Sequence, residues 1–437
     1  MTVARKYPPL ESVGEFRDPV HGFIEPFPHE KEIIDTAEFQ RLRHISQLGL
    51  TSYVYHGAEH SRFGHSIGVM HLAGEAAHRI LQNSRAFICE QLRWSDEDFE
   101  EKSRRVFVLA RVAGLVHDLG HPPFSHAGQA GFFPEKLDHE NYTQEIVLST
   151  AIGEIIDRTL KDFDISKEEV VDLLRKTHPI GFLGELVSSP WDVDKMDYLL
   201  RDSHYCGVGY GNYDLSRIVR SLALCSDEAG SMTLAIEEEG LHCLEGLVLA
   251  RYFMFTQVYF HEVRRAYDLV LADLIAELLE ERYDSATYPG PADIEEYLSW
   301  DDVAVLAAAA QKANAKSRNP AWMVRHRRHP KKVFSTLPHP DPIVAKRAFR
   351  SLFQDMKARF QGVRLWADRA TDHPERYRSE IFGIPVRLEA GRSESFAGHA
   401  HALQGLREIG QVRLYADVGD NESLQEKIAH ACRAYMA

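Results

Sequence analysis

The sequence has few cysteines, no excess of basic residues and no long hydrophobic run. Its five cysteines, among 437 residues, are scattered without C-x-x-C spacing, which argues against a disulfide framework and against a structural zinc site. No run of 18 or more apolar residues occurs, and the first residues lack an apolar signal segment, so neither a membrane span nor secretion is expected. We therefore expect reduced thiols and a cytoplasmic protein.

The overall charge is acidic. Sixty-five Asp and Glu residues against 51 Lys and Arg residues give a formal net charge of −14. Broad binding to nucleic acid or to an anionic membrane needs a basic surface, so no membrane partner is expected and a nucleic-acid partner is not favoured. A hydrophobic content of 44% is sufficient for a folded protein with one large domain and one smaller domain.

Apolar residues recur at three-to-four spacing through most of the first 280 residues, which is typical of amphipathic helices. This pattern predicts helices over 31–50, 65–83, 103–120, 139–160 and 192–205. A longer segment, 245–283, is apolar on most faces and predicts a central buried helix or pair of helices. The clearest strand in this part of the chain is 232–238.

The chain changes character towards its C-terminus. Proline, glycine and small polar residues gather at 283–293 and predict a break. Residues 384–390 and 411–418 have the pattern of strands, and 421–436 has that of a helix opened by an Asn or Ser cap. We predict a mainly α protein with a helical core over 1–285, followed over 286–437 by a helical extension and a small C-terminal α/β module.

Histidine is unusually frequent, with 23 copies, and it is the commonest metal ligand. The stretch HDLGHPPFSH at 117–126 follows an apolar helix and holds three histidines and an aspartate. Burying several titratable groups there is costly unless they are paired or bound to a metal. His117 and Asp118 at a helix end can both reach one cation, and His65 and Asp194 lie near the start of other apolar-periodic helices.

Two histidines and two aspartates suit one divalent transition metal such as Mn, Fe, Co, Ni or Zn, with Mg also open. Taken singly, however, each of these four residues is more readily explained as a helix cap or a hydrogen-bonded residue. The complete ten-residue stretch, rather than the HD dipeptide alone, favours a metal site.

Several motifs carry a family resemblance. HSRFGHSIGV, AGLVHDLGHPPFSHA and DVDKMDYLLRDSHYCGV resemble the successive motifs of the HD-domain phosphohydrolases. Together with RDPVHGFI and FQRLRHISQLG they are most similar to the deoxynucleoside triphosphate triphosphohydrolases, which include the HD domain of a vertebrate enzyme that also carries a SAM domain. The similarity extends over about residues 15–270 and fades after 285. It implies an HD-domain helical core and a metal-dependent hydrolase that converts a dNTP to a deoxynucleoside and triphosphate.

The resemblance also implies roles for individual residues. The implied metal ligands are His65, His117, Asp118 and Asp194. The implied catalytic residues, which transfer protons and contact phosphate around the α-phosphorus, are His121, His126 and His139. These roles are chemically sensible, because a divalent cation makes water a usable nucleophile near neutral pH and an imidazolium can protonate the leaving 5′ oxygen.

Substrate contacts follow from the same resemblance. Arg62 and Lys195 would neutralise phosphate charge; Gln47, Tyr198 and Asp202 would bind the sugar; Leu48 and Tyr267 would crowd the 2′ position and disfavour ribonucleotides. Without the motif match, Arg62 and Lys195 would be taken as exposed surface residues. An aromatic in a long apolar helix, such as Tyr267, is usually a core residue.

The sequence departs from the family pattern at Gln129, where related enzymes often carry a carboxylate three residues after the histidine aligned with His126. An amide can accept a hydrogen bond but adds no negative charge, so we expect the His126 imidazolium to be less favoured. Glu135 or Asp138 could compensate. Otherwise the activity is slow or directed at another phosphoester.

Regulation is a second implication. Nucleotide-activated relatives assemble as tetramers with guanine nucleotide between subunits, and the guanine-reading positions correspond to Asp35, Gln40 and Arg43. The same residues are equally well explained as a capped helix with an exposed polar face. We therefore expect a homo-oligomer, dimer or tetramer, and leave GTP or dNTP activation open, with the basic stretch 324–332 as a source of phosphate contacts.

Two other functions stay open. A phosphodiesterase or single-strand nuclease of the same superfamily would use the stretch 324–332 to bind a polynucleotide, and Gln129 and the diverged C-terminus motivate that alternative. A nucleotide-sensing scaffold would bind a dNTP without turnover. A solvated basic loop is the simplest explanation of the charged stretch itself.

Overall fold

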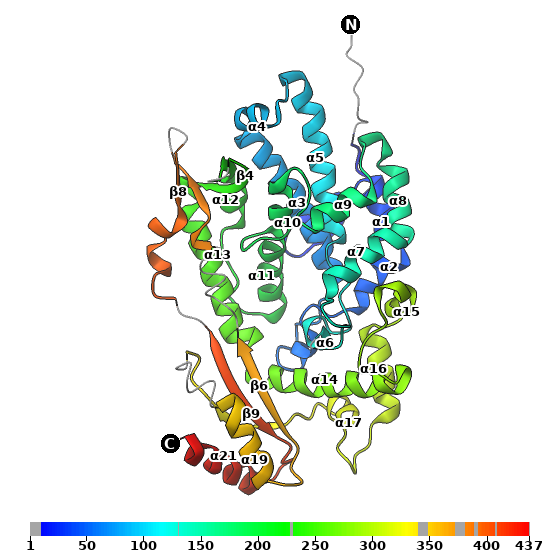
Figure 1. The fold of residues 1–437 in the computed structure, drawn as a ribbon, viewed down its shortest axis with the longest axis vertical. Helices are drawn as coiled ribbons and strands as arrows, with labels where there is room; N and C mark the ends of the chain where they lie inside the picture. Colours follow the sequence, from blue (N-terminus) through cyan, green and yellow to red (C-terminus); the bar gives the residue numbers. More distant parts are fainter. Residues whose placement is uncertain are drawn as a thin grey trace.

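The computed structural model describes residues 10–129, 131–227, 230–339, 348–371, 381–388, 392–406 and 409–436. Most of this part is helical, and the small sheets lie mainly towards the C-terminal end of the chain (Figure 1). The prediction of a mainly α protein is confirmed. No helix among the described residues is both long and apolar enough to cross a bilayer.

Three helices form the centre of the helical core. Helices α3 (Arg62–Asn83) and α5 (Asp96–Val116) pack along their lengths, and α11 (Val193–Cys206) packs against α3. The helices α3 and α5 can approach closely at Gly114 because glycine has no side chain. A Cβ atom at this position would lie only 3.0 Å from the Ala73 Cβ atom. The beginning of α3, the end of α5 and the beginning of α11 therefore meet in one region.

Capping residues divide two of the predicted helices. The segment 31–50 forms α1 (Pro28–Ile34), α2 (Ala37–Gln40) and two 3-10 turns, because the Thr36 side chain caps α2. The segment 139–160 forms α7 (His139–Ser149) and α8 (Ala151–Thr159), because the Thr150 hydroxyl caps α8. Apolar spacing continues through both caps, so the sequence pattern does not reveal the breaks.

The long apolar segment is a pair of helices, which is one of the two predicted forms. Helix α13 (Leu241–Met254) continues into a π-helical turn at Phe255–Tyr259, and α14 (Glu262–Tyr283) begins after His261, whose ring accepts a hydrogen bond from Val263 N. A π-helical turn is rare and often accompanies a functional site.

The other helices surround this core. They are α4 (Arg85–Leu92), α6 (His126–Gln129), α9 (Lys167–Leu174), α10 (Gly181–Val187), α12 (Leu215–Arg220), α15 (Ile294–Leu298), α16 (Asp302–Lys312) and α17 (Pro320–Arg325).

Three small sheets complete the fold. Strands β1 (Phe16–Asp18) and β2 (Gly22–Ile24) form a hairpin. The second sheet has the order β3 (Leu222–Ser226), β4 (Met232–Glu237), β7 (Pro385–Arg387), β8 (Ser393–Ser395), with β4 and β7 parallel. The third is antiparallel, with the order β5 (Lys331–Ser335), β9 (Gly410–Ala416), β6 (Leu365–Thr371), and α19 (Phe353–Arg359) and α21 (Glu422–Met436) pack against it.

The two predicted C-terminal strands belong to different sheets. The segment predicted as 384–390 contributes β7, and its last two residues lie outside the described part; 411–418 contributes β9. A second hydrophobic core, which includes Val333, Leu414 and Ile428, lies within the C-terminal sheet and its helices. The predicted domain boundary at residue 285 stays a prediction. One sheet crosses it, because β4, which precedes residue 285, pairs with β7, which follows it.

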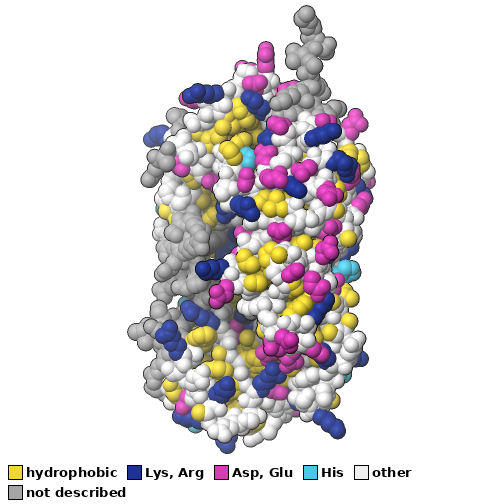
Figure 2. Space-filling model, turned by 45° about the vertical axis from the view of Figure 1, so that its right-hand side comes forward, with side chains coloured by type: hydrophobic (Ala, Val, Ile, Leu, Met, Phe, Trp, Pro, Cys, Tyr) yellow, Lys and Arg dark blue, Asp and Glu magenta, His cyan; other side chains and the backbone are white. Residues whose placement is uncertain are grey.

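On the face shown in Figure 2, acidic side chains are spread widely and basic side chains lie among them. Among the described residues of this face, basic side chains are interrupted by acidic and apolar ones, whereas general polynucleotide binding requires a continuous basic surface.

Candidate active site

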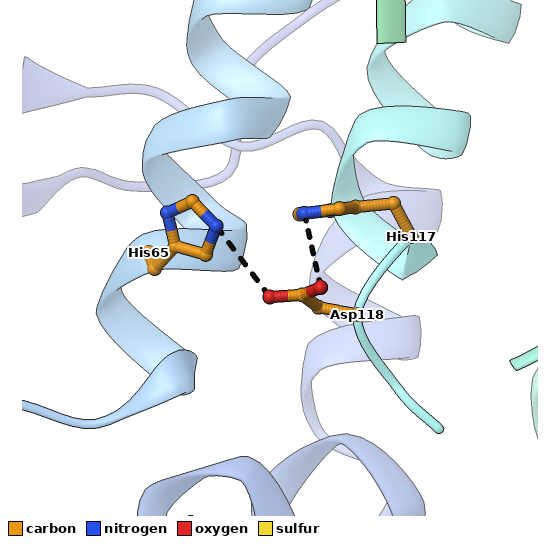
Figure 3. Close-up of side chains that lie close together, drawn as sticks. All are labelled: His65, His117 and Asp118. Carbon is orange, nitrogen blue, oxygen red and sulfur yellow. Dashed lines mark ion pairs between the residues drawn. The ribbon is translucent and has the colours of Figure 1, made fainter. Parts of the chain in front are cut away.

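The four predicted metal ligands come together where the three central helices meet. His65 lies in the first turn of α3, while His117 ends α5 and Asp118 follows it (Figure 3). The Nε2 atoms of His65 and His117 lie 3.5 Å and 3.4 Å from the Asp118 carboxylate. Asp194, in the first turn of α11, places Oδ1 3.0 Å from His65 Nε2 and 3.6 Å from His117 Nε2.

The two histidines are oriented for metal binding. His65 Nδ1 contacts Asp197 Oδ2 at 2.7 Å, and His117 Nδ1 contacts the Gly114 carbonyl at 2.8 Å. Both Nε2 atoms are buried and have no partner in hydrogen-bonding geometry within the described structure. An imidazole held through Nδ1 presents its Nε2 lone pair to a cation, so His65, His117 and Asp118 fit a divalent metal. Asp194 Oδ1 lies beside both Nε2 atoms.

The electrostatics of the centre also favour a cation. Burial lowers the pKa of His65, but the carboxylates of Asp194 and Asp197 outweigh burial and raise this pKa to about 10. A metal ion that binds His65 must therefore displace a proton.

A buried group that we did not predict supports the metal centre. Asp197 accepts two hydrogen bonds of 2.8 Å from Arg201 and contacts His21 Nε2 at 2.6 Å, in addition to His65. Arg201 also donates to Asp18 at 2.9 Å, so the β1–β2 hairpin is tied to the centre. The spacing of Asp194, Asp197 and Arg201 along one helix face was the available sequence signal.

A cavity of about 400 Å³ opens on the metal centre. Predicted site residues in its lining are Gln47, Leu48, Arg62, Asp118, His121, His126, His139, Asp194, Tyr198 and Asp202. Residues in the lining that we did not predict are Phe124, Phe255, Tyr259, Phe260, Arg264 and Arg265. All of these except Phe124 lie in the π-helical turn or follow it. The periodicity of the sequence does not reveal a π-helical turn, so these lining residues could not be predicted from it.

Three histidines lie together beside the metal ligands. The rings of His121 and His139 stack with centroids 3.9 Å apart, and the His126 ring lies 5.2 Å from that of His121. Burial and Arg62 lower the pKa of His121 and of His126. The nearest partner of His126 Nδ1 is Gln129 Oε1, at 3.3 Å.

Arg62 joins this histidine group to the metal ligands. Its guanidinium donates to Asp118 and, at 2.7 Å, to Ser125 Oγ. Asp118 also lies 3.2 Å from His121 Nε2, and Asp118, His121 and His139 are close enough to hold a cation as well. The end of the cavity near the metal centre therefore combines cationic and imidazole groups, which suits a phosphate.

The other end of the cavity carries a buried carboxylate. Asp202 contacts His60 Nε2 at 2.8 Å and accepts a 2.7 Å hydrogen bond from the Tyr259 hydroxyl. Tyr198 lies beside Tyr259, with ring centroids 6.4 Å apart. Gln47 Oε1 is buried without a hydrogen-bond partner among the described residues. This end can bind hydroxyl groups of a ligand.

Two predicted substrate contacts lie outside the lining of this cavity. Lys195 pairs with Asp192 at 2.9 Å. Tyr267 is 1% exposed and packs against Tyr53 and His329, with ring centroids 5.0 Å and 5.3 Å away. Tyr267 is thus a core aromatic here, which was the alternative considered for it.

The predicted activator residues lie at the surface near α2. Gln40 donates to the Ile34 carbonyl at 2.7 Å, and Arg43 Nε donates to Gln40 Oε1 at 2.7 Å. Asp35 pairs with Lys31. These contacts resemble those of a polar helix surface, and activator binding there stays a prediction.

The basic stretch 324–332 is largely engaged within the chain. Arg325 donates to the Ala310 carbonyl, Arg327 donates to the Tyr53 carbonyl, and Lys332 pairs with Glu262. Arg328 is 3.9 Å from Asp420. A hydrogen bond to a carbonyl leaves the guanidinium charge in place, and Arg325, Arg327 and Arg328 are exposed, so polynucleotide binding by this stretch stays a prediction.

Comparisons with known proteins agree with this geometry. The HD domain family matches residues 62–201, and the HD-associated region matches residues 213–337. Uncharacterized protein YwfO of Bacillus subtilis is 34% identical over 308 residues, which cover 67% of this chain and 64% of that protein. Deoxynucleoside triphosphate triphosphohydrolase SAMHD1 of Homo sapiens is 30% identical over 292 residues, which cover 60% of this chain and 44% of SAMHD1.

A similar solved structure extends over nearly the whole chain. The crystal structure of a hypothetical protein from Aquifex aeolicus matches with a TM-score of 0.71 and 28% identity, and covers 95% of this chain and 99% of that one. By contrast, the chain spans less than two thirds of the length of each of the two curated relatives above.

Proposed function

Because the chain belongs to the HD-domain superfamily of metal-dependent phosphohydrolases, we propose that it hydrolyses deoxynucleoside triphosphates to deoxynucleoside and triphosphate. One observation carries this proposal. A single cavity of about 400 Å³ is lined at one end by Asp118 and Asp194, two of the predicted metal ligands, and at a second polar end by Gln47, Tyr198 and Asp202. A nucleoside triphosphate has the matching chemistry, with anionic phosphates at one end and sugar hydroxyls at the other.

The phosphate end would carry the reaction. When bound, the cation would polarise a phosphate oxygen and lower the pKa of water. Arg62 would neutralise phosphate charge through its guanidinium. The water oxygen would bond to the α-phosphorus while the bond from phosphorus to the 5′ oxygen breaks, and His126 as imidazolium would give its proton to that oxygen. The proton that the water loses would pass to solvent, from which His126 is reprotonated.

The sugar end would select the substrate. Each Asp202 oxygen has one partner in the described structure, so each retains acceptor capacity for the 3′-hydroxyl. Leu48 would crowd the 2′ position, and Phe255 and Phe260 would provide an apolar wall for the base. Similarity to the triphosphohydrolase SAMHD1 supports this substrate class.

Product analysis tests the proposal. Purified protein is incubated with each dNTP, alone and with GTP, in Mn and in Mg, and the products are resolved by ion-exchange chromatography. We expect triphosphate and free deoxynucleoside in equal amounts. Intact dNTPs from metal-loaded protein under every condition would contradict the proposal, and cleavage of an oligonucleotide instead would favour the phosphodiesterase alternative.

Regulation by a second nucleotide and self-assembly belong to the same proposal. If GTP binds at Asp35, Gln40 and Arg43, the GTP arm of this experiment should show faster turnover and light scattering should show a larger assembly. Equal rates and masses with and without GTP would contradict activation.

Gln129→Glu is expected to move the basic limb of the pH profile of kcat/KM to higher pH. Burial and Arg62 lower the pKa of His126, and its Nδ1 contacts the uncharged Gln129 side chain. A carboxylate there raises that pKa and increases the imidazolium fraction at neutral pH. A rise of one pKa unit would increase kcat/KM on the basic limb by roughly tenfold.

The matched control is Gln129→Ala, which removes the amide without adding charge and should not move the basic limb to higher pH. His126→Gln should remove the basic limb of the pH profile and lower kcat by about 10²–10⁴-fold. A Gln129→Glu profile that superposes on the wild-type profile would exclude His126 as the proton donor.

A further inference from the structure

The loop that carries His121 and His126 has an energetically unfavourable backbone. Phe124 and Ser125, which lie between these histidines, both have φ of 58°. Consecutive non-glycine residues in the left-handed region are uncommon and persist only when surrounding contacts hold them. The loop therefore depends on its neighbours for its conformation.

Those neighbours lie far along the chain, in residues 288–302, which lead into α16. Tyr297 OH donates to the Gly120 carbonyl at 2.6 Å, and Tyr288 OH donates to the Gly128 carbonyl at 3.1 Å. Tyr288 N donates to the Phe132 carbonyl at 2.7 Å. We call residues 288–302 the strap, because they bind the histidine loop and its continuation at several points.

Arg41 adds a bridge between the strap and the loop. Its buried guanidinium donates to the Trp300 carbonyl at 2.6 Å and to the His121 carbonyl at 3.0 Å. The strap therefore contacts the loop both directly and through Arg41.

Asp302 makes the contact that joins two cavity walls. Its side chain is buried, with the residue 5% exposed, and its two oxygens accept from Phe124 N at 2.6 Å and from Ser46 N at 2.8 Å. Ser46 precedes Gln47 and Leu48 in the cavity lining. One carboxylate thus holds both the histidine loop and the wall proposed to bind the sugar.

A hydrogen-bond chain completes this connection. Ser125 Oγ donates to the Ser46 carbonyl at 2.6 Å and accepts from Arg62 Nε at 2.7 Å. Asp302 therefore fixes two backbone segments that also meet through Ser125 and Arg62.

We propose that Asp302 is a positioning residue for hydrolysis, which holds the histidine loop and the Gln47 wall in the geometry that the reaction needs. This inference rests on the proposed function. Asp302 contacts none of the proposed metal ligands in the described structure, so it acts on the loop rather than on the metal. A misplacement of about 1 Å at a reacting group can cost about 10²-fold in rate.

Only a carboxylate satisfies both backbone donors. In Asp302→Asn, the amide oxygen would accept from one backbone N–H, and the amide NH₂ group would face the other donor. Burial raises the pKa of Asp302 to about 6, so the carboxylate form dominates at pH 7.5. We therefore expect a specific defect from Asp302→Asn, which changes little volume.

The test compares Asp302→Asn with Asp301→Asn. Asp301 is the neighbouring N-cap, whose side chain accepts from Ala304 N at 2.7 Å, and asparagine caps helices as well. We expect kcat to fall by about 10–100-fold in Asp302→Asn, with a smaller change in KM and wild-type metal content. In Asp301→Asn, kcat, KM and metal content should all stay near their wild-type values.

Hydrogen exchange supplies a readout that needs no substrate. Amides in 44–50 and 119–127 should exchange faster in Asp302→Asn than in Asp301→Asn, while those in α3 and α5 should not change. Tyr297→Phe, which deletes one hydroxyl of the strap, should show the same effects to a smaller extent and serves if Asp302→Asn does not fold.

The outcomes separate the two proposals. If wild-type protein does not hydrolyse dNTPs, the proposed function fails, and the exchange rates still decide whether Asp302 holds the loops. Unchanged exchange in both segments, or kcat within about twofold of wild type in folded Asp302→Asn, would overturn the inference.

Discussion

Asp118→Asn is expected to abolish metal-dependent hydrolysis, with a fall in kcat/KM of about 10³-fold or more. Asp118 lies within 3.5 Å of the Nε2 atoms of both His65 and His117, and removing its charge leaves the cation with a weaker ligand. Metal-ion catalysis contributes several kcal/mol to the stabilisation of a transition state, and about 4 kcal/mol corresponds to about 10³ in rate.

Two measurements check this prediction together: metal content by mass spectrometry and kcat/KM with a saturating metal concentration. The matched control is Asp157→Asn, at a surface carboxylate whose partner is Lys167, 3.8 Å away. Wild-type turnover by Asp118→Asn protein that has lost its metal would show that the centre is not the site of reaction.

Asp197→Asn is expected to reduce both stability and metal affinity. Asp197 is fully buried and is the bidentate partner of Arg201, which is 1% exposed. Breaking a buried ion pair from one side costs up to about 3–5 kcal/mol in the free energy of unfolding. Arg201 would then keep Asp18 as its charged partner, so we expect a cost at or below the lower end of this range. Loss of the carboxylate that orients His65 should also weaken metal binding by about 10–100-fold.

The pH dependence of unfolding distinguishes this pair from a general defect. Burial opposes ionisation, but Arg201 and the hydrogen bonds from His21 and His65 hold the pKa of Asp197 well below its usual range. A carboxyl group with a depressed pKa stabilises the fold fully above its unfolded pKa of about 4, and this stability is lost progressively as the pH falls from that value through the folded pKa. Asp197→Asn should lack this acid-dependent component.

Urea unfolding of metal-free protein at about pH 7, pH 4 and pH 2 follows this component across the range in which it is lost, with Asp157→Asn again as the control. Equal unfolding free energies for wild type and Asp197→Asn at neutral pH would mean that the buried pair does not stabilise the fold.

The candidate metal ligands could be singled out in the sequence because each lies at a helix end that sequence patterns mark. His117 ends an apolar helix, and His65 and Asp194 lie in first turns. A polar residue at the end of a buried apolar segment is visible without knowledge of the fold. The way the ends meet came from family resemblance rather than from spacing.

The supporting residues could not be predicted in the same way, because their partners are distant in sequence. His21 and Asp197 are separated by 176 residues, and Asp302 and Phe124 by 178. Neither Asp302 nor Tyr259 breaks the helical pattern of the sequence, so no local signal marks either residue as part of the site. Their roles follow only from the packing of α14, the strap and α16 against the histidine loop.

Local chemistry also limited the prediction of the fold. Thr36 and Thr150 cap new helices inside segments of continuous apolar spacing, and periodicity does not report a cap. Tyr267 illustrates a second limit, because residue type alone does not distinguish an aromatic that contacts a sugar from one that, like Tyr267, is buried against Tyr53. The distinction required the tertiary structure.

Hydrolysis in ¹⁸O-labelled water shows whether this metal centre directs water to the α-phosphorus of a dNTP. Protein stripped with a chelator is titrated with Mn in the presence of one dNTP, and both products are analysed by mass spectrometry. We predict that one ¹⁸O atom enters triphosphate, none enters the deoxynucleoside, and the yield follows metal occupancy. Label in the deoxynucleoside, release of pyrophosphate, or an intact dNTP at full occupancy would contradict the account.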